Sequence, residues 1–375
     1  MLEQVPDLIR TRFVINEREE NILLVNDHTV VNFSSNDYLA LADHPSLKKA
    51  FIQGVDKYGL GSGSSPLVSG YYRSQCLLEE KFSEFFNRER SLLFNSGYLA
   101  NVGILSAFQN RHEKIYSDKL CHASILDGIE LSKRKNIRYR NNDLSHLQEL
   151  LISATDKPLL ITESVFSMEG RISPIKQIAD MCPDNVMLIV DDAHGAGVLG
   201  ENGRGIIEHD ALGKEDIDCL VTPLGKAFAS MGAVVSGSSA FIEYLLQFSK
   251  TYKYSTALPP AVAHATLTAL QLVQDENWRR HQLRDLINFF IQESNSRSLT
   301  LSSTDLTPIK SIIIGENAQT LMIKDALLKE GFFVSCIRPP TVPKGTARLR
   351  ISLNCMHRKD DILKLLDLIE SLCRK

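Results

Sequence analysis

The stretch Val186-Met187-Leu188-Ile189-Val190 is followed at once by Asp191-Asp192-Ala193-His194-Gly195. Five apolar residues without polar alternation are typical of a strand buried on both faces, as in a parallel sheet. Ligands of open α/β sheets bind beyond the carboxyl ends of the strands, where Asp191 and His194 would stand. The stretch therefore predicts an α/β fold with functional groups at one edge of its central sheet.

A second predicted strand, 218–222, leads into a turn that carries Lys226. Lys226 follows Asp191 by 35 positions (226 − 191) and is expected at the same sheet edge. Pyridoxal phosphate (PLP) needs a lysine for its Schiff base and an acid at its pyridine nitrogen, and His194 is placed to hydrogen-bond its phenolic oxygen. In the alternative interpretation, Asp191 caps a helix, His194 is a satisfied polar residue and Lys226 is a surface charge. Spacing alone favours neither.

The composition sets limits on the class of protein. With 375 residues the chain exceeds one typical core. The net charge of −3, from 42 basic and 45 acidic residues, gives no electrostatic case for binding nucleic acid or membrane. Seven scattered cysteines without a Cys-x-x-Cys pair indicate reduced thiols and neither disulfides nor a metal site. With no apparent signal segment and no run long enough to span a bilayer, a cytoplasmic protein is expected.

Strands alternate with helices up to about residue 260, which predicts crossover units and a mostly parallel sheet flanked by helices. Three parts are expected: an N-terminal segment (1–40), a large cofactor-binding domain (41–260) and a smaller α+β C-terminal domain (261–375). Residues 1–20 are expected to be helical and to precede a hairpin that turns at Asn26-Asp27. The other predicted helices are 44–58, 75–88, 99–108, 123–133, 174–182, 259–275, 276–295 and 359–373, and the other predicted strands are 91–94, 114–116, 158–163, 309–314, 332–337 and 346–353.

Two local features suggest anion binding. Ser96 is a plausible N-cap, so the backbone N–H groups of Gly97 and Tyr98 would lie at a helix N-terminus, where a phosphate binds well. A simple capped turn is the alternative. The glycine-rich stretch 58–66 follows no predicted strand and lacks a Gly-Lys-Ser/Thr ending, so it is better explained as a loop at a substrate entrance or a subunit contact than as a nucleotide loop.

Several longer motifs are distributed along nearly the whole chain. They are Asn36-Asp37-Tyr38-Leu39, Phe94-Asn95-Ser96-Gly97-Tyr98-Leu99-Ala100-Asn101, His122-Ala123-Ser124-Ile125, Thr162-Glu163-Ser164-Val165-Phe166-Ser167-Met168-Glu169-Gly170, Asp191-Asp192-Ala193-His194-Gly195, Gly203-Arg204-Gly205 and Gly225-Lys226-Ala227. Together they resemble the α-oxoamine synthases, which use PLP to condense an amino acid with an acyl thioester and release CO₂. Within this family, the segments 254–260 and 337–350 resemble most the member that serves biotin synthesis. The resemblance implies the fold-type I fold of PLP-dependent transferases.

The same resemblance implies roles around the cofactor. Lys226 would carry PLP and then remove the substrate's Cα proton, since an amine beside a cationic ring has a lowered pKa. Asp191 would pair with the pyridine nitrogen, and His194 with the phenolic oxygen. The other implied contacts are His122, which stacks on the ring, Gly97 and Tyr98, whose backbone binds the phosphate, and Ser167, within hydrogen-bonding range.

For the substrates, the resemblance implies L-alanine and a pimeloyl thioester carried by coenzyme A or an acyl carrier protein. Arg350 would hold the amino-acid carboxylate, because a guanidinium makes two parallel hydrogen bonds where lysine makes a point contact. Arg10 and Thr341 would line the acyl side, and His122 would help to place the substrate. A homodimer with the active site between subunits is implied, with Thr256 reaching the partner's phosphate.

One departure from the family pattern concerns Pro223, at a position where relatives usually have threonine. Proline has neither a hydroxyl nor an N–H donor, and the nearest hydroxyl belongs to Thr222, so weaker cofactor binding is expected.

Three other functions stay open. They are glycine C-acetyltransferase or another α-oxoamine synthase, a catalytically silent partner subunit, and, more weakly, a nicotinamide dehydrogenase built on the glycine-rich stretch.

Overall fold

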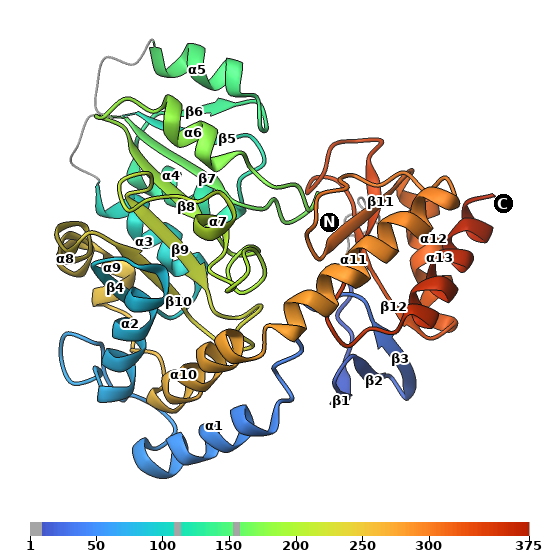
Figure 1. The fold of residues 1–375 in the computed structure, drawn as a ribbon, viewed down its shortest axis with the longest axis horizontal. Coiled ribbons are helices and arrows are strands. Elements are labelled where there is room, and N and C mark those ends of the chain that lie inside the picture. Colours follow the sequence, from blue (N-terminus) through green and yellow to red (C-terminus); the bar gives the residue numbers. More distant parts are fainter. Residues whose placement is uncertain (1–9, 109–113, 153–157, 375) are drawn as a thin grey trace, which may run out of the picture. The chain divides into compact units, whose positions relative to one another are not determined.

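The computed structural model describes residues 10–108, 114–152 and 158–374 (Figure 1). By the density of internal contacts the chain divides into two compact units. The large unit comprises residues 44–166 and 172–277, and the small unit comprises 1–43, 167–171 and 278–375. The three-part division expected from the sequence stays a prediction.

The large unit is built on a seven-stranded sheet in which one strand, β10, runs antiparallel to both of its neighbours. All the other pairs are parallel. This sheet confirms the predicted α/β class. Its strands, in spatial order, are β4 (Arg90–Phe94), β10 (Ala233–Gly237), β9 (Cys219–Pro223), β8 (Met187–Asp191), β7 (Leu159–Glu163), β5 (Ile115–Asp118) and β6 (Asn136–Tyr139).

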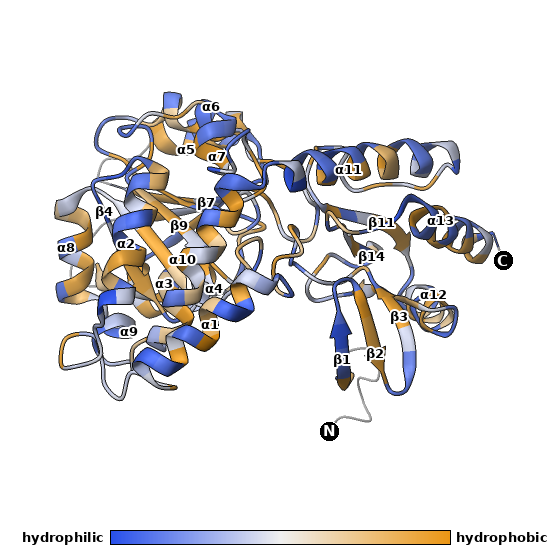
Figure 2. Cartoon of the chain, turned by 60° about the horizontal axis from the view of Figure 1, so that its bottom comes forward, coloured by the Kyte–Doolittle hydropathy of each residue, from blue (hydrophilic) through white to orange (hydrophobic). Residues whose placement is uncertain are grey.

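Figure 2 shows the central strands of this sheet as hydrophobic. Helices cover the sheet because such strands must be shielded from water on both faces. Every residue of β7 is buried, and β8 is buried from Leu188 onward. The covering helices bury apolar side chains such as Ile104 and Ile125 against the strands. The helices in the described part of the large unit are α1 (Pro45–Tyr58), α2 (Arg73–Phe86), α3 (Gly97–Ala107), α4 (Ala123–Ser132), α5 (Leu144–Ile152), α6 (Ile175–Met181), α7 (Ile206–His209), α8 (Ser239–Phe248), α9 (Lys250–Lys253) and α10 (Pro260–Asp275).

The carboxyl ends of β7, β8 and β9 lie at one edge of the sheet because these strands are parallel. Glu163 ends β7 and is the direct register partner of Asp191, which ends β8. Asp191 in turn pairs with Val221 of β9, whose strand leads into the turn that carries Lys226. The fold thus places the acid and the lysine at the end of adjacent strands.

The described part of the small unit (residues 10–43, 167–171 and 278–374) contains two sheets and three helices, in the α+β pattern. One sheet has the order β1 (Ile15–Glu19), β2 (Ile22–Val25), β3 (His28–Asn32) and β12 (Phe332–Phe333), and the other has the order β11 (Ile309–Gly315), β14 (Ala347–Ser352) and β13 (Ser335–Ile337). The predicted hairpin turn is confirmed, because Asn26 and Asp27 both adopt the positive φ that such tight turns require. The helices are α11 (Trp278–Ser296), α12 (Asn317–Lys329) and α13 (Lys359–Cys373).

The prediction of a helix over residues 1–20 is wrong for its described part. Residues 15–19 form β1, a fully exposed strand that pairs antiparallel with β2, while residues 1–9 lie outside the described residues. Figure 2 shows β1 as hydrophilic and β2 as hydrophobic, so β1 is held by backbone pairing and not by a buried face. The sequence analysis also missed β6, β10, α5, α7, α8, α9 and α12.

His357 is a buried histidine at the centre of the small unit. Its ring stacks on Phe33 with centroids 4.1 Å apart, and its Nε2 donates to the carbonyl of Asn32 at 3.0 Å. Its Nδ1 accepts from the backbone N–H of Asn354 at 2.9 Å, so the ring is neutral. Burial lowers the pKa of His357 to about 4.

This histidine predicts a loss of stability in mild acid. The unfolded chain gains a proton near pH 6.5, whereas the folded chain resists protonation down to about pH 4. Stability is therefore full above pH 6.5 and falls as the pH drops toward 4. We expect His357 to account for about 2 kcal/mol of the fall between pH 7.5 and pH 5. Urea denaturation followed by the fluorescence of Trp278, the single tryptophan, would measure it.

His357→Gln should remove this part of the pH dependence, and His28→Gln, at an exposed position of β3, is the matched control. An equal fall between the two pH values in the wild type and in His357→Gln would contradict the assignment.

Candidate active site

Lys226, His194 and Asp191 come together at the edge of the large unit's sheet. The Nζ of Lys226 lies 3.1 Å from the Nε2 of His194. Asp191 is 4% exposed, and its carboxylate accepts from the backbone N–H of Ala193 at 3.1 Å and from the amide of Asn101 at 2.7 Å. These two donors hold the acid in place beside the lysine turn.

His122 follows β5 at the same edge and caps α4. Its Nδ1 accepts from the backbone N–H of Ser124 at 3.2 Å, and its own backbone N–H donates to Glu163 at 2.5 Å. The side chain keeps solvent-exposed surface. Desolvation of the ring nevertheless lowers the pKa of His122, and Lys226 adds to this effect while Asp191 opposes it. The ring is therefore held neutral near pH 7, and the residue stays exposed to solvent.

Two further buried acids stand beside Asp191. Burial raises the pKa of Glu163 well above its ordinary value, and the neighbouring charge of Asp191 adds to the rise. Asp192 accepts from the hydroxyl of Ser164 at 2.5 Å and from the backbone N–H of Ile206 at 3.1 Å, and burial raises its pKa to about 7. A Cβ at Gly205 would lie 1.8 Å from the Asp192 carboxylate, which explains the glycine in the motif 203–205.

The start of α3 has the geometry of an anion site. The hydroxyl of Ser96 accepts from the N–H of Leu99 at 3.2 Å, which confirms the predicted N-cap. Gly97 and Tyr98 stand in the first turn of α3, where backbone N–H groups have no acceptor within the helix. A Cβ at Gly97 would lie 2.5 Å from the Cγ of Pro223, so only glycine allows this close approach.

Pro223 provides a test of the phosphate site. Thr222, the nearest hydroxyl, is fully buried and its Oγ1 has no hydrogen-bond partner among the described residues. It therefore does not replace the missing threonine. We expect Pro223→Thr to add one hydrogen bond and to lower the Kd for PLP by about 3- to 10-fold. Titrating the PLP-free protein with PLP would measure the change.

Thr222→Val is the matched control for this prediction, since it removes the buried hydroxyl on the preceding residue. It should leave the Kd for PLP unchanged. An unchanged Kd in Pro223→Thr, or weaker binding in Thr222→Val, would show that Pro223 does not weaken the site.

The small unit holds a second group of predicted site residues around Arg350. Its Nε donates to the carbonyl of Ser167 at 2.7 Å, one Nη donates to the hydroxyl of Ser352 at 2.9 Å, and the other donates to the amide oxygen of Asn36 at 3.2 Å. Burial raises the pKa of the adjacent Tyr38 to about 12, although Arg350 opposes that rise. The guanidinium is thus held in a fixed orientation with N–H groups to spare.

Arg10 contacts the segment 338–341 of the small unit, and Thr341 is the last residue of that segment. Arg10 is exposed and donates to the carbonyl of Pro339 at 3.5 Å, and the N–H of Thr341 donates to the carbonyl of Arg338 at 3.1 Å. Arg10 also lines a groove of about 740 Å³. The other residues that line it are Thr11, Phe13, Leu321, Lys324, Asp325, Leu328, Phe333, Val334, Ser335, Cys336, Ile337 and Arg338.

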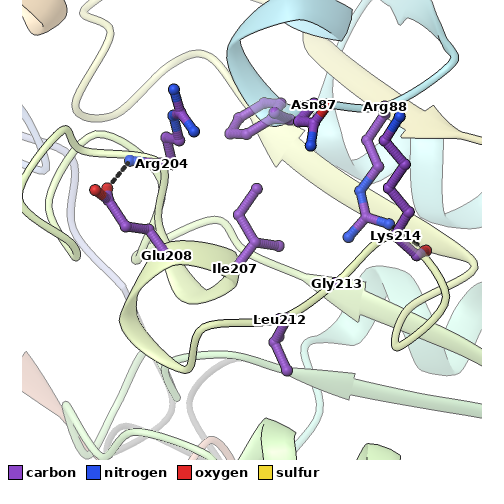
Figure 3. Close-up of a pocket in the computed structure, with 9 residues that line it drawn as sticks. Asn87, Arg88, Arg204, Ile207, Glu208, Leu212, Gly213 and Lys214 are labelled. Atoms are coloured by element: carbon purple, nitrogen blue, oxygen red, sulfur yellow. Dashed lines mark hydrogen bonds between the residues drawn. The ribbon is translucent and has the colours of Figure 1, made fainter.

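A smaller cavity of about 120 Å³ lies elsewhere in the large unit (Figure 3). Its buried Arg88 donates to the backbone carbonyls of Lys214 at 2.6 Å and Ile217 at 3.1 Å. Its Glu208 accepts from the backbone N–H of Arg204 at 3.2 Å. None of the predicted site residues lines this cavity, so it is separate from the candidate site.

Sequence reasoning did not assign roles to Asn101, Ser124, Glu163 or Asn36, although all four lie inside the quoted motifs. Asn101 carried a usable signal, because a single amide in the apolar helix 97–107 must be hydrogen-bonded when it is buried. Glu163 lies beside Asp191 only because β8 is the neighbour of β7 in the sheet, and the order of the strands in the sheet cannot be read from the sequence.

Comparison with known proteins identifies the family. The family model of aminotransferase class I and II matches residues 28–369. The chain is 44% identical over 364 residues to 8-amino-7-oxononanoate synthase of Methylococcus capsulatus, which covers 96% of this chain and 94% of that protein. The chain belongs to the aminotransferase class I and II family, among the 8-amino-7-oxononanoate synthases. This confirms the resemblance seen in the motifs.

Solved structures of this family have the same fold. An 8-amino-7-oxononanoate synthase from Francisella tularensis is 38% identical and matches with a TM-score of 0.83, covering 91% of this chain and 97% of that one. Serine palmitoyltransferase from Sphingomonas wittichii is 26% identical and matches with a TM-score of 0.94, covering 99% and 95% of the two chains. In the described part of the chain, none of the helices has the length and apolarity needed to cross a membrane.

Proposed function

We propose that this chain is a PLP-dependent acyltransferase that joins L-alanine to a pimeloyl thioester, releases CO₂ and forms 8-amino-7-oxononanoate for biotin synthesis. The observation that carries the proposal is the meeting of Lys226, His194 and Asp191 at the carboxyl edge of a parallel sheet. The relatives named 8-amino-7-oxononanoate synthase support the choice of product.

The residues at this edge fit PLP. Lys226 offers the amine, Asp191 offers a buried acid for the pyridine nitrogen, and His122 offers a solvent-exposed ring for stacking. His194 would contact the phenolic oxygen, and Ser167 would add a hydrogen bond. The N–H groups of Gly97 and Tyr98, at the N-terminus of α3, suit a phosphate. When bound, PLP supplies an electron sink for the negative charge that develops at the substrate's Cα.

Lys226 has two tasks in this proposal. It holds the resting cofactor, and once the substrate amine has taken its place it accepts the Cα proton on Nζ. A general base works best when its pKa is close to the working pH, and a cationic ring beside the amine moves the pKa in that direction. His194, at 3.1 Å, keeps Nζ in a defined position for the transfer.

Arg350 would bind the carboxylate of L-alanine, with Arg10 and Thr341 on the acyl side. The support for Arg350 is its orientation, since three hydrogen bonds to Ser167, Ser352 and Asn36 leave part of its five-donor guanidinium available. His122 would help to place the same substrate.

Arg350→Lys should raise the KM for L-alanine by about 10- to 100-fold, because lysine cannot make the paired hydrogen bonds to a carboxylate. Initial rates at a saturating thioester concentration would measure it. Arg348→Lys is the matched control, since Arg348 lies two residues away on β14, is equally buried, and is paired with Glu169 at 3.0 Å. Similar KM values for the wild type and Arg350→Lys would remove Arg350 from the substrate site.

We also propose that the protein is a homodimer and is located in the cytoplasm. The surface of the large unit supports the dimer. Apolar side chains are exposed in the segment 60–71, including Leu60 and Val68, which are each 80% exposed. Burying such a patch against a second copy would stabilise a dimer. Thr256, also exposed, would reach the partner's phosphate. All seven cysteines are free thiols, as expected in a reducing compartment.

The deciding experiment is an absorbance spectrum of the purified protein, followed by addition of L-alanine. We expect a visible band from lysine-bound PLP that shifts on addition of alanine, and product formation with a pimeloyl thioester. Absence of the band would indicate a silent partner subunit. Turnover of glycine with acetyl-CoA, and not of alanine with a pimeloyl thioester, would indicate a glycine C-acetyltransferase.

A further inference from the structure

A chain of hydrogen bonds joins Asp191 to His122 inside the large unit. The amide nitrogen of Asn101 lies 2.7 Å from Oδ2 of Asp191 and 3.0 Å from Oγ of Ser124. The same Oγ lies 2.8 Å from Nδ1 of His122. Asn101 and Ser124 are each 1% exposed, so water does not compete for these bonds. The carboxylate of Asp191 and the imidazole of His122 are therefore not independent of one another.

The donor and the acceptor of each of these hydrogen bonds follow from the groups at the two ends of the series, the carboxylate of Asp191 and the backbone N–H of Ser124. A carboxylate accepts only, so the Asn101 amide must donate to Asp191, and its second N–H is then directed to Ser124. The backbone N–H of Ser124 can only donate, so Nδ1 of His122 must accept. The Ser124 hydroxyl, which accepts from Asn101, donates its own proton to the same Nδ1. Nδ1 therefore carries no proton.

The surroundings of His122 come from four elements. Its backbone N–H donates to Glu163 at the end of β7, while Asp191 at the end of β8 and Asp127 on α4 favour a charged ring. Lys226, after β9, opposes a charged ring, and so does the loss of water around the imidazole. No described residue accepts a hydrogen bond from Nε2. The ring has one nitrogen committed to the protein and one left for a ligand.

We propose that Asn101 and Ser124 are positioning residues that hold His122 as a neutral imidazole with its proton on Nε2. The inference is about the ring's tautomer and stands on the hydrogen bonds alone. Its catalytic consequence rests on the proposed function: the Nε2–H is a fixed donor for an oxygen of the bound substrate, and the ring can stack on PLP without adding a positive charge beside Lys226.

Nitrogen-15 NMR of histidine-labelled protein tests the tautomer, with and without added PLP. The signals of His122 are assigned by their absence in His122→Gln. The wild type should show an unprotonated Nδ1 and a protonated Nε2 at pH 7. Ser124→Ala should yield a mixture of tautomers and raise the titration midpoint of His122 by about 0.5–1 pH unit, because one donor to the neutral ring is lost. Ser124→Thr, which keeps the hydroxyl, should restore both properties.

The matched control is Ser132→Ala, which removes an equally buried hydroxyl from the far end of α4, where it bonds to the carbonyl of Ile129 at 2.6 Å. It should change neither the tautomer nor the midpoint. A proton on Nδ1 in the wild type overturns the proposal without any variant. The same tautomer and midpoint in Ser124→Ala as in the wild type would also overturn it.

The kinetic readout separates this inference from the proposed function. If the enzyme condenses alanine with a pimeloyl thioester, Ser124→Ala should move the acidic limb of its kcat/KM profile upward by the same amount as the NMR midpoint. A protein that binds no PLP would refute the proposed function but leave the tautomer result intact. A protein that is active while Ser124→Ala shifts neither the NMR midpoint nor the pH profile would refute the inference alone.

Discussion

Lys226→Ala should lower kcat/KM for the condensation by at least about 10⁴-fold, because in the proposed function this one side chain both holds PLP and moves the Cα proton. Borohydride reduction followed by mass spectrometry of peptides should place PLP on Lys226 in the wild type and nowhere in the variant. Added methylamine should restore a small part of the activity, since a free amine can accept the proton without holding the cofactor.

Lys310 provides a demanding control for this result. It is 0% exposed, its ammonium donates to the carbonyl of Asp305, and burial lowers its pKa to about 8, so it is also an amine that loses its charge readily. It lies on β11 in the small unit, whereas Lys226 belongs to the large unit. Lys310→Met should keep the PLP attachment. Recovery of PLP on Lys310 would refute the proposed site.

Asp191→Asn should lower kcat by about 10³-fold, because an amide cannot hold a proton on the pyridine nitrogen while charge develops at Cα. The visible band of bound PLP should shift as well, which a loss of folding alone would not produce. Asp191→Glu should recover part of the rate, since it keeps the charge near the donors Asn101 and Ala193.

Asp192→Asn is the matched control one residue away. Burial raises the pKa of Asp192 to about 7, so about half of it is already uncharged at neutral pH, and an amide resembles that form. We expect less than a tenfold loss of rate. If Asp191→Asn retained activity within tenfold of the wild type, or if Asp192→Asn were the more damaged variant, the pyridine partner would have been assigned to the wrong acid.

The sequence predicted the main strands of the large unit and most of its helices because their signals are local. The apolar run before Asp191 has the composition of a strand that is buried on both faces, and β8 is such a strand. The closing helix was predicted with its observed bounds, 359–373, because its apolar positions repeat with helical spacing.

The errors arose where long-range pairing determines the structure. The segment Glu17-Arg18-Glu19 has the composition of an exposed helix, yet it is an edge strand because β2 offers it a row of backbone partners. The strand β10, Ala233–Gly237, was missed altogether, and although all five of its residues are buried, burial does not indicate its direction. Antiparallel pairing with both β4 and β9 is settled by the connections, not by local composition.

The residues of the candidate site also differ in whether a local signal in the sequence indicates them or only a contact between distant segments does. Lys226, Asp191 and His194 were predicted together because each follows a strand end, and the large unit does bring them together. Asn101 and Ser124 were missed because their partner atoms come from different segments of the chain. Such contacts become visible when the strand order is known.

The division of the chain between the units bears on how the protein is made. A ribosome completes the large unit at residue 277, whereas the small unit contains both chain ends. Its strand β3 must wait for β12, since Val31 pairs with Phe332, 301 residues later (332 − 31). Closing so long a loop is slow relative to local pairing. The hairpin of β2 and β3 is therefore synthesised long before its partner strand β12, and a nascent chain halted before residue 332 would leave its apolar face exposed to chaperones.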